Sequence, residues 1–342
     1  MTNVNNNLQS KIHMKSKHKS VSLSIVVLTA VGLILASCSS SSSIKATSKA
    51  SSLTSALTNI QLASAQLNQA KTAAITLTGS VNMSSSLGSL SNSGSSNGLN
   101  LTINGNGNMD IATNYENMSL NMPLSINLPN EPGSSTITEK IVRSGNILYL
   151  QMPNMPGSGS LGSGWYSINL SNFSELSNTS ALTAEFENPA LLIQSLSSVS
   201  SVESEDTVTI NGQTYNEYKL NVGLEKMLGK YASKMASSVG SCLNSEYNVP
   251  VTVLITPQNQ LHSISMSMNM SDMFSPNSKL SALMSLFSLN LNMQVVYSNY
   301  GETFNEYVPT GAKPLPSSMP GSLSGSSFDS SKLNSMMSSL CS

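Results

Sequence analysis

The sequence predicts an α+β domain built on one large antiparallel sheet. About ten segments alternate apolar and polar residues, which is the period of a strand with one buried face. Only a few segments place apolar residues at steps of three and four, as an amphipathic helix does. Neither a second apolar core nor an internal repeat divides the chain, so we expect one folded domain over residues 46–312.

The first predicted element is an amphipathic helix over about Lys45 to Ala70. Its apolar positions recur at steps of three and four and are Leu53, Leu57, Ile60, Ala63 and Leu67. Three strands are predicted next, over 75–83, 99–111 and 118–126, with a Ser- and Gly-rich loop at 84–98. Each strand is apolar on one side only, which is typical of an antiparallel sheet covered on a single face.

Two turn signals in the middle of the chain predict hairpins. Ser144-Gly145-Asn146 separates two apolar runs, and so does Asn211-Gly212, which is one of the stronger short-range turn signals. Asn188-Pro189 predicts the start of a helix, because the Asn side chain caps and Pro fits the first helical position. A further helix is predicted over 224–238.

The last third of the domain returns to strands. Residues 251–256 are expected to pair with 261–270 across the turn at 257–260, and 289–297 alternates again. The tail at 313–342 is rich in Ser, Pro and Gly, so we expect it to be mostly disordered.

The N-terminus predicts export and lipid attachment. A basic start precedes the uncharged apolar run from Val21 to Ala36, which is short for a membrane span and typical of a signal peptide over 1–37. Leu35-Ala36-Ser37-Cys38 resembles a lipobox, so Cys38 is the expected lipidation site, followed by a serine-rich tether at 38–45. The alternatives are an uncleaved transmembrane anchor and a secreted protein in which Cys38 is incidental.

Composition and charge narrow the choice of partner. Charged residues are 10% of the chain, against about 25% in typical soluble domains. Cleavage of the signal peptide removes four of the 16 basic residues, namely Lys11, Lys15, Lys17 and Lys19, and none of the 17 acidic ones. The mature chain then has 12 basic and 17 acidic residues, which gives a formal charge of −5. This excess of negative charge argues against nucleic acid as a partner. The bacterial membrane, reached through a lipid anchor outside the cytoplasm, is the expected partner.

The remaining cysteines predict a disulfide. An exported chain with two cysteines beyond the lipidated one usually pairs them, so we expect a bond between Cys242 and Cys341. Metal binding is the weaker alternative, because only His262 remains in the mature chain to complete a zinc shell. No cofactor is predicted.

Enzyme activity is not expected. Gly94 to Gly98 matches the G-x-S-x-G pattern, but it lies in a low-complexity loop with no helix after it. A Ser-His-Asp triad could use only His262. Asn104 to Asp110 loosely matches a calcium loop, but amides replace most of the carboxylates.

The order of the elements resembles the LppX/LprG lipoprotein family of mycobacteria, which shares the architecture of the LolA/LolB lipoprotein carriers. The resemblance runs from about Lys71 to Pro309. It is carried by Trp165-Tyr166, Asn188-Pro189-Ala190-Leu191-Leu192, the segment 208–222, and Val296-Tyr297-Ser298-Asn299-Tyr300-Gly301 followed by Val308-Pro309. This chain departs from the family pattern at Asn188, where the family usually has Asp, and in its long loops at 84–98 and 153–164.

The resemblance implies a strongly curved antiparallel half-barrel whose helices cover the concave face around a hydrophobic cavity. It also implies a non-catalytic protein of the cell envelope that binds or transfers a lipid or glycolipid. The alternative is a surface structural or adhesion lipoprotein with a solid core and no ligand.

Methionine on the apolar side of four strands and one helix favours the cavity, because flexible thioether chains line surfaces that adapt to varied shapes. Ordinary core packing is the alternative explanation for these methionines. The residues expected to line the cavity are Leu77, Val81, Leu101, Ile103, Met118, Leu120, Met122, Leu150, Leu192, Leu196, Met227, Leu228, Ile264, Met266, Met268, Met270, Leu291, Met293 and Val295.

Overall fold

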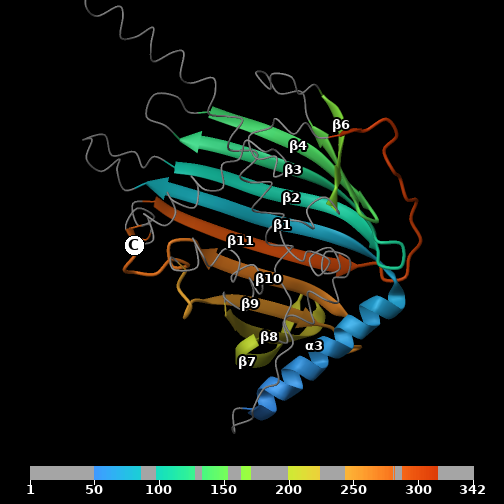
Figure 1. Ribbon diagram of the computed structural model, residues 1–342. Coiled ribbons are helices and arrows are strands. Elements are labelled where there is room, and N and C mark those ends of the chain that lie inside the picture. The colour runs from blue at the N-terminus through green and yellow to red at the C-terminus, as the bar shows by residue number, and fades with distance from the viewer. Residues whose placement is uncertain are drawn as a thin grey trace, which may run out of the picture.

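Every strand in the described part of the chain joins one sheet (Figure 1). The computed structural model describes residues 50–85, 98–127, 133–152, 163–170, 199–223, 243–279, 281 and 287–314. Its elements are helix α3 (Ala50–Ala70) and strands β1 (Thr72–Ser85), β2 (Gly98–Asp110), β3 (Tyr115–Asn127), β4 (Gly133–Ser144), β5 (Ile147–Met152), β6 (Gly164–Asn169), β7 (Val199–Ile210), β8 (Gln213–Gly223), β9 (Asn248–Ile255), β10 (Leu261–Asn269), β11 (Phe287–Ser298) and β12 (Lys313–Pro314).

The sheet consists of two meanders joined in the middle. The strand order is β12-β6-β5-β4-β3-β2-β1-β11-β10-β9-β8-β7. Neighbours are antiparallel except β12, which runs parallel to β6. The strands β1 to β6 follow one another in space as they do in the chain, and so do β7 to β11, so consecutive strands pair throughout each meander.

The junction between the meanders is the pairing of β1 with β11. Ala74 lies opposite Ser298 and Ser85 lies opposite Phe287, with an unbroken register between them. The two strands are more distant in sequence than any other antiparallel neighbours in the sheet, so this pairing holds the N-terminal and C-terminal parts of the domain together.

The register gives the sheet an apolar face and a polar face. Leu77 on β1 lies between Gly105 on β2 and Val295 on β11, and none of these three residues has a polar side chain. The neighbouring row has Thr78 opposite Asn104 and Gln294. Because side chains alternate between the faces of a strand, one face is built from Leu, Ile, Val and Met and the other from Asn, Ser and Thr.

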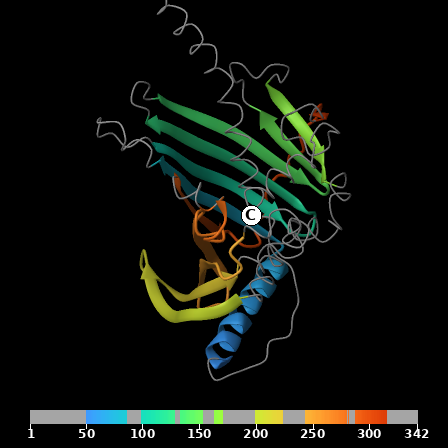
Figure 2. The same cartoon turned by 60° about the vertical axis from the view of Figure 1, so that its left-hand side comes forward.

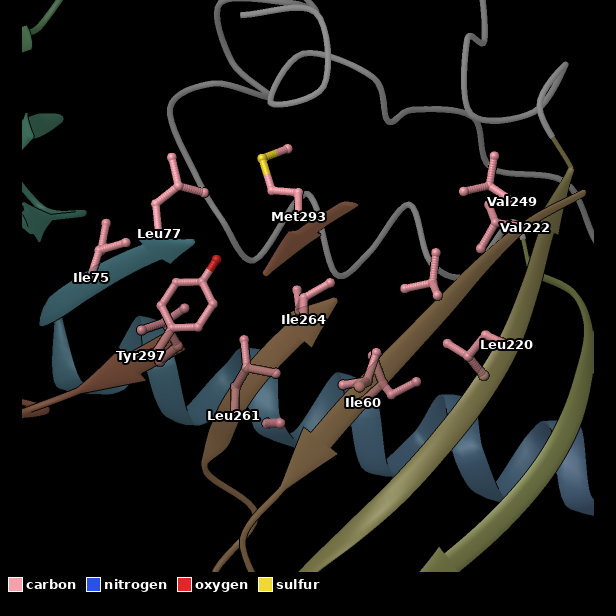
Figure 3. Packing of buried hydrophobic residues seen from close by; sticks show 14 of the residues in the cluster. Ile60, Ile75, Leu77, Leu220, Val222, Val249, Leu261, Ile264, Met293 and Tyr297 are labelled. Carbon is pink, nitrogen blue, oxygen red and sulfur yellow. The ribbon is translucent and has the colours of Figure 1, made fainter. Parts of the chain in front are cut away.

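Helix α3 packs on the apolar face at the β7 end of the sheet. Ala56, Ile60, Ala63 and Leu67, at steps of four, three and four, are fully buried in the same cluster as residues of β8 to β11 (Figure 3). The side-chain amide of Asn59 donates a hydrogen bond of 2.8 Å to the Tyr218 hydroxyl on β8. Figures 1 and 2 both place α3 away from β3 to β6.

The C-terminal segment after β11 crosses to the other meander. The backbone N–H of Tyr307 donates a hydrogen bond of 2.9 Å to the Tyr115 hydroxyl, and Thr113 donates one of 2.6 Å to the Glu306 carboxylate. The chain then forms β12 at the edge beside β6. The opposite edge is β7, which exposes Glu203, Glu205 and Asp206.

Most strands and turns that the sequence predicts are confirmed. Helix α3 ends at Ala70 as expected, and both predicted hairpins are present. Asn211 and Gly212 both have positive φ, of 51° and 81°, which is the conformation that a two-residue type I′ turn requires. Gly145 has a φ of 56° in the other hairpin.

The predicted strong curvature and the predicted helical cover are corrected by the structure. The sheet is open, since β12 and β7 are edges that do not pair with each other. β-Bulges bend strands, and register shifts occur only in the pairings of β10 with β9 and of β7 with β8, so the central strands run without such a bend. Among the described residues α3 is the helix that packs on the apolar face, and it does so at one end.

Other predictions fall at or beyond the limits of the described residues. The expected tail begins at 313, yet Lys313 and Pro314 form β12, because the backbone there pairs with β6. The signal peptide, the tether, Cys38, Cys242 and Cys341 lie outside the described residues, as do the helices predicted at Asn188 and over 224–238. These remain predictions.

Two glycines on the apolar face of β2 give a stability test. A Cβ at Gly107 would lie 1.8 Å from the backbone oxygen of Asn117, whereas at Gly105 the nearest atom is the Leu120 Cδ2, at 2.8 Å. The Leu120 side chain can rotate away from the new Cβ, whereas the backbone oxygen of Asn117 cannot. We expect Gly107→Ala to lower the free energy of unfolding by about 3 kcal/mol and Gly105→Ala by about 1 kcal/mol. Urea unfolding of both variants measures this, and equal losses would contradict it.

Candidate functional site

The central part of the apolar face is the candidate functional site. Met266 lies opposite Met293, and Met268 lies opposite Leu291, at the pairing of β10 with β11. On the far side of β11, Leu291 lies opposite Val81. Met268, Leu291 and Met293 are 5–6% exposed, so the rows form a continuous apolar surface across these strands.

The structure brings most of the predicted lining residues together. One cluster of buried side chains contains Leu77, Leu101, Ile103, Met118, Leu120, Met122, Ile264, Met268, Leu291 and Met293, and half-buried Val81, Met266 and Val295 pack against it. Leu150 is buried on β5, outside this cluster, and half-buried Met270 follows the end of β10. Leu192, Leu196, Met227 and Leu228 lie outside the described residues.

Three charged residues on the apolar face of β3 and β4 were missed by the sequence analysis. Glu116 on β3, and Glu139 and Arg143 on β4, point to the same side as the apolar residues beside them. The sequence does contain a signal for their position. Glu116 is two and four residues from Met118 and Leu120, so it lies on the same face of the strand as they do. Charged residues are nearly always solvated, so the sequence alone does not distinguish these three from surface charges.

Glu116 and Arg143 form a buried pair of opposite charge. They lie directly opposite each other on β3 and β4. Burial raises the pKa of the Glu116 carboxyl, and the Arg143 charge lowers it in part. Arg143 is 6% exposed and its Nε donates a hydrogen bond of 3.1 Å to the Gly145 carbonyl. The pKa of Tyr297 on β11 is raised by burial and by the Glu116 charge, so its hydroxyl stays protonated.

Glu139 is buried in a different environment. It lies opposite Leu120 on β3, and Ile137 and Ile141 are its neighbours on the same face of β4. Its exposed fraction is 6%. Burial raises the pKa of this carboxyl to about 7. Within the part of the chain that the structure describes, we find no hydrogen bond or ion pair for its side chain.

The polar face carries neutral hydrogen-bonding groups. Ser267 donates a hydrogen bond of 2.7 Å to Asn292, whose amide donates one of 3.4 Å to Ser80. No charged residue lies on this face of β1, β3, β10 or β11. Over these four strands the two faces of the sheet therefore differ in polarity.

Catalysis and metal binding gain no support from the described residues. His262 stacks on Tyr215 with ring centroids 4.3 Å apart, and burial lowers its pKa. No three or more His, Cys, Asp or Glu residues in the described ranges lie close enough together to hold a metal ion. The G-x-S-x-G match falls mainly outside those ranges. None of the helices among the described residues is both long and apolar enough to span a bilayer.

Comparison with known proteins finds structural likeness without close relatives. The chain matches no protein-family model and no curated protein. It is similar to the lipoprotein LppX of Mycobacterium tuberculosis, at 14% identity over 74% of this chain and 98% of LppX, with a TM-score of 0.38. It is also similar to LprF of Mycobacterium bovis, at 10% identity over 76% of this chain and 98% of LprF, with a TM-score of 0.35.

LppX also gives its name to the LppX/LprG family that the sequence resembles. With TM-scores below 0.5, the structural likeness carries no argument about ligand or chemistry. The functional proposals therefore depend on the residues of this chain.

The buried Glu139 predicts a particular pH dependence of stability. Its pKa is about 7 in the folded chain and 4.5 in the unfolded reference, so the folded state binds more protons between these values. The free energy of unfolding should therefore fall as the pH rises through this window. Glu139→Gln cannot ionise, so its decline from pH 5 to pH 8 should be smaller by about 1–3 kcal/mol.

Urea unfolding of both proteins at the two pH values measures the difference. Glu116 shifts in the same direction, but it is present in both proteins and its contribution cancels. Exposed Glu302→Gln is the control and should decline as the wild type does. An unchanged pH dependence in Glu139→Gln would show that the carboxyl does not titrate in this window.

Proposed function

We propose that this chain is a membrane-anchored, non-catalytic lipoprotein of the bacterial cell envelope that binds and transfers a lipid or glycolipid. The acyl chains lie along the apolar face of β1, β10 and β11. The observation that carries the proposal is the extent of this face, which runs from β3 to β9, while α3 packs at the β7 end. A continuous apolar surface of this breadth is suited to an apolar ligand.

The side chains of the face support the same proposal. Met266, Met268 and Met293 meet at the β10–β11 pairing, where their unbranched chains can adapt to acyl chains of different shapes.

Anchoring is proposed from the N-terminus. A diacylglycerol on Cys38 would hold the domain at a membrane, because each buried methylene contributes about 0.8 kcal/mol to the anchor. The serine-rich tether after Cys38 buries no apolar surface and leaves the domain free to approach the bilayer.

The second candidate function is a structural or adhesion lipoprotein with a solid core. The low exposure of Met268, Leu291 and Met293 favours it, because side chains that are 5–6% exposed are already covered. The two candidate functions differ in whether a lipid can reach these side chains.

Anchoring is tested by Cys38→Ala. We expect the variant to leave the membrane fraction, because nothing in the tether replaces the acyl chains. Ser37→Ala keeps a small residue before Cys38 and should remain in the membrane fraction. Detergent-free fractionation of cells that express each form gives the measurement, and full membrane retention of Cys38→Ala would exclude a lipid anchor at this residue.

Lipid binding is tested by Met268→Trp. If acyl chains lie beside Met268, the larger side chain should weaken binding of a fluorescent acyl lipid about tenfold and lower stability by less than about 1 kcal/mol. Ser267→Trp is the matched control, since Ser267 is exposed on the polar face. In a solid core, Met268→Trp should instead lose roughly 1–3 kcal/mol, and the wild type should bind no lipid. That second result would favour the structural lipoprotein.

A further inference from the structure

The apolar face is not uniform, and its two halves suit different parts of a ligand. On β11 the residues of this face are Leu289, Leu291, Met293 and Val295, with no polar group until Tyr297. On β4 the corresponding residues are Ser135, Ile137, Glu139, Ile141 and Arg143, where polar and apolar side chains alternate. In the sheet, β3, β2 and β1 lie between β4 and β11. The polar half and the hydrocarbon half are therefore two parts of one continuous face.

Arg143 does not account for the burial of Glu139. Arg143 lies opposite Glu116, which supplies its opposite charge, whereas Glu139 lies opposite Leu120. Four residues along the same strand separate Glu139 from Arg143, a distance of roughly 13 Å between their backbones. The opposite charges of Glu116 and Arg143 therefore lie on one row, and the Glu139 carboxyl lies on another row among Leu120, Ile137 and Ile141.

A carboxyl in this position can meet a polar partner that comes from elsewhere. Glu139 is 6% exposed, and among the described residues its side chain has no hydrogen bond or ion pair. Its carboxyl oxygens are not among the fully buried side-chain atoms without a partner in the described residues, so they keep some contact with open space. A carboxyl that points from the sheet into the apolar face is placed to meet a polar group of the ligand.

The hydrogen-bonding capacity of the Glu139 carboxyl favours a hydroxyl as its partner on the ligand. Burial holds Glu139 largely protonated up to about pH 7, and a protonated carboxyl both donates and accepts a hydrogen bond. A lipid hydroxyl does the same, so the two groups can form a reciprocal pair without burying a net charge. A fully esterified lipid has no hydroxyl, so it can accept a hydrogen bond from the carboxyl but cannot donate one to it.

We propose that Glu139 is a specificity-determining residue that hydrogen-bonds a hydroxyl of the bound lipid, so that the polar group lies over β3 and β4 and the acyl chains extend toward β10 and β11. The ligand is then a neutral lipid with a free hydroxyl, such as a diacylglycerol or a glycolipid. This inference rests on the proposed function and adds the class and orientation of the ligand.

The experiment compares two lipids built from oleoyl chains, which differ because a third oleoyl ester replaces the free hydroxyl. 1,2-Dioleoylglycerol has one free hydroxyl, and trioleoylglycerol has none. The purified full-length protein should bind dioleoylglycerol about tenfold more tightly, measured by displacement of a fluorescent acyl probe. Glu139→Leu should abolish this preference. Glu139→Gln should keep most of it, because an amide still donates and accepts.

Lys140→Gln is the matched control, because Lys140 is the next residue on β4 and points to the polar face. It should behave as the wild type. Infrared difference spectra provide a second measurement, which does not depend on Glu139→Leu folding. The carboxylic acid C=O band of the wild type should shift with dioleoylglycerol and not with trioleoylglycerol, and Glu139→Gln should lack the band.

Each other outcome overturns a defined part of the argument. Equal wild-type affinity for the two lipids, or the same preference in Glu139→Leu, would overturn the role of Glu139 while leaving the proposed lipid binding intact. A preference for a cationic acyl lipid over both would replace the hydroxyl with an ion pair. Binding of none of these lipids would overturn the proposed function and this inference together.

Discussion

The antiparallel pairing of β1 with β11 is the constraint on which the rest of the structure depends. It joins the meander β1 to β6 to the meander β7 to β11, and it fixes which side of every strand faces the core. The side-chain period of a strand is two, so a slip of one residue would move Leu77 and Met293 to the polar face and expose them. The apolar face is therefore continuous across both meanders only in this register. Helix α3 depends on it too, because its C-terminus leads directly into β1.

Local features of the fold could be predicted from the sequence, and the long-range ones could not. Alternation of Ile75, Leu77 and Val81 indicates a strand, and Asn211-Gly212 indicates a turn, because both signals lie within a few residues. No local signal says that β1 pairs with β11. The apolar spacing of α3 gives the side of the helix that is buried, but not the end of the sheet on which it packs. The expected curvature came from a family resemblance, and the central strands lack the bulges that would bend them.

The residues of the candidate site also fall into those that the sequence predicts and those that it does not. The apolar residues could be predicted, because parity alone places Met266 and Met268 on one face. Glu139 could not be recognised, because its burial depends on the neighbours that strand pairing brings to it. Its place opposite Leu120 becomes visible only with the register. A sheet with a purely structural role would be more stable with an apolar residue at this position, so the carboxyl is a reason to consider a ligand alongside a solid core.

The two edges of the sheet bear on how many copies can share one membrane. Unpaired edge strands invite a second chain to add, and proteins often prevent this with charge, proline or short strands. Here β7 exposes Glu203, Glu205 and Asp206, and β12 is two residues long and ends at Pro314. If lipid anchors confine many copies to one plane, like charges on β7 repel where two such edges meet, and β12 offers almost no backbone to extend. A crowded layer of this protein would then stay free of sheet-to-sheet fibres, even though it has few charges elsewhere to keep its copies apart.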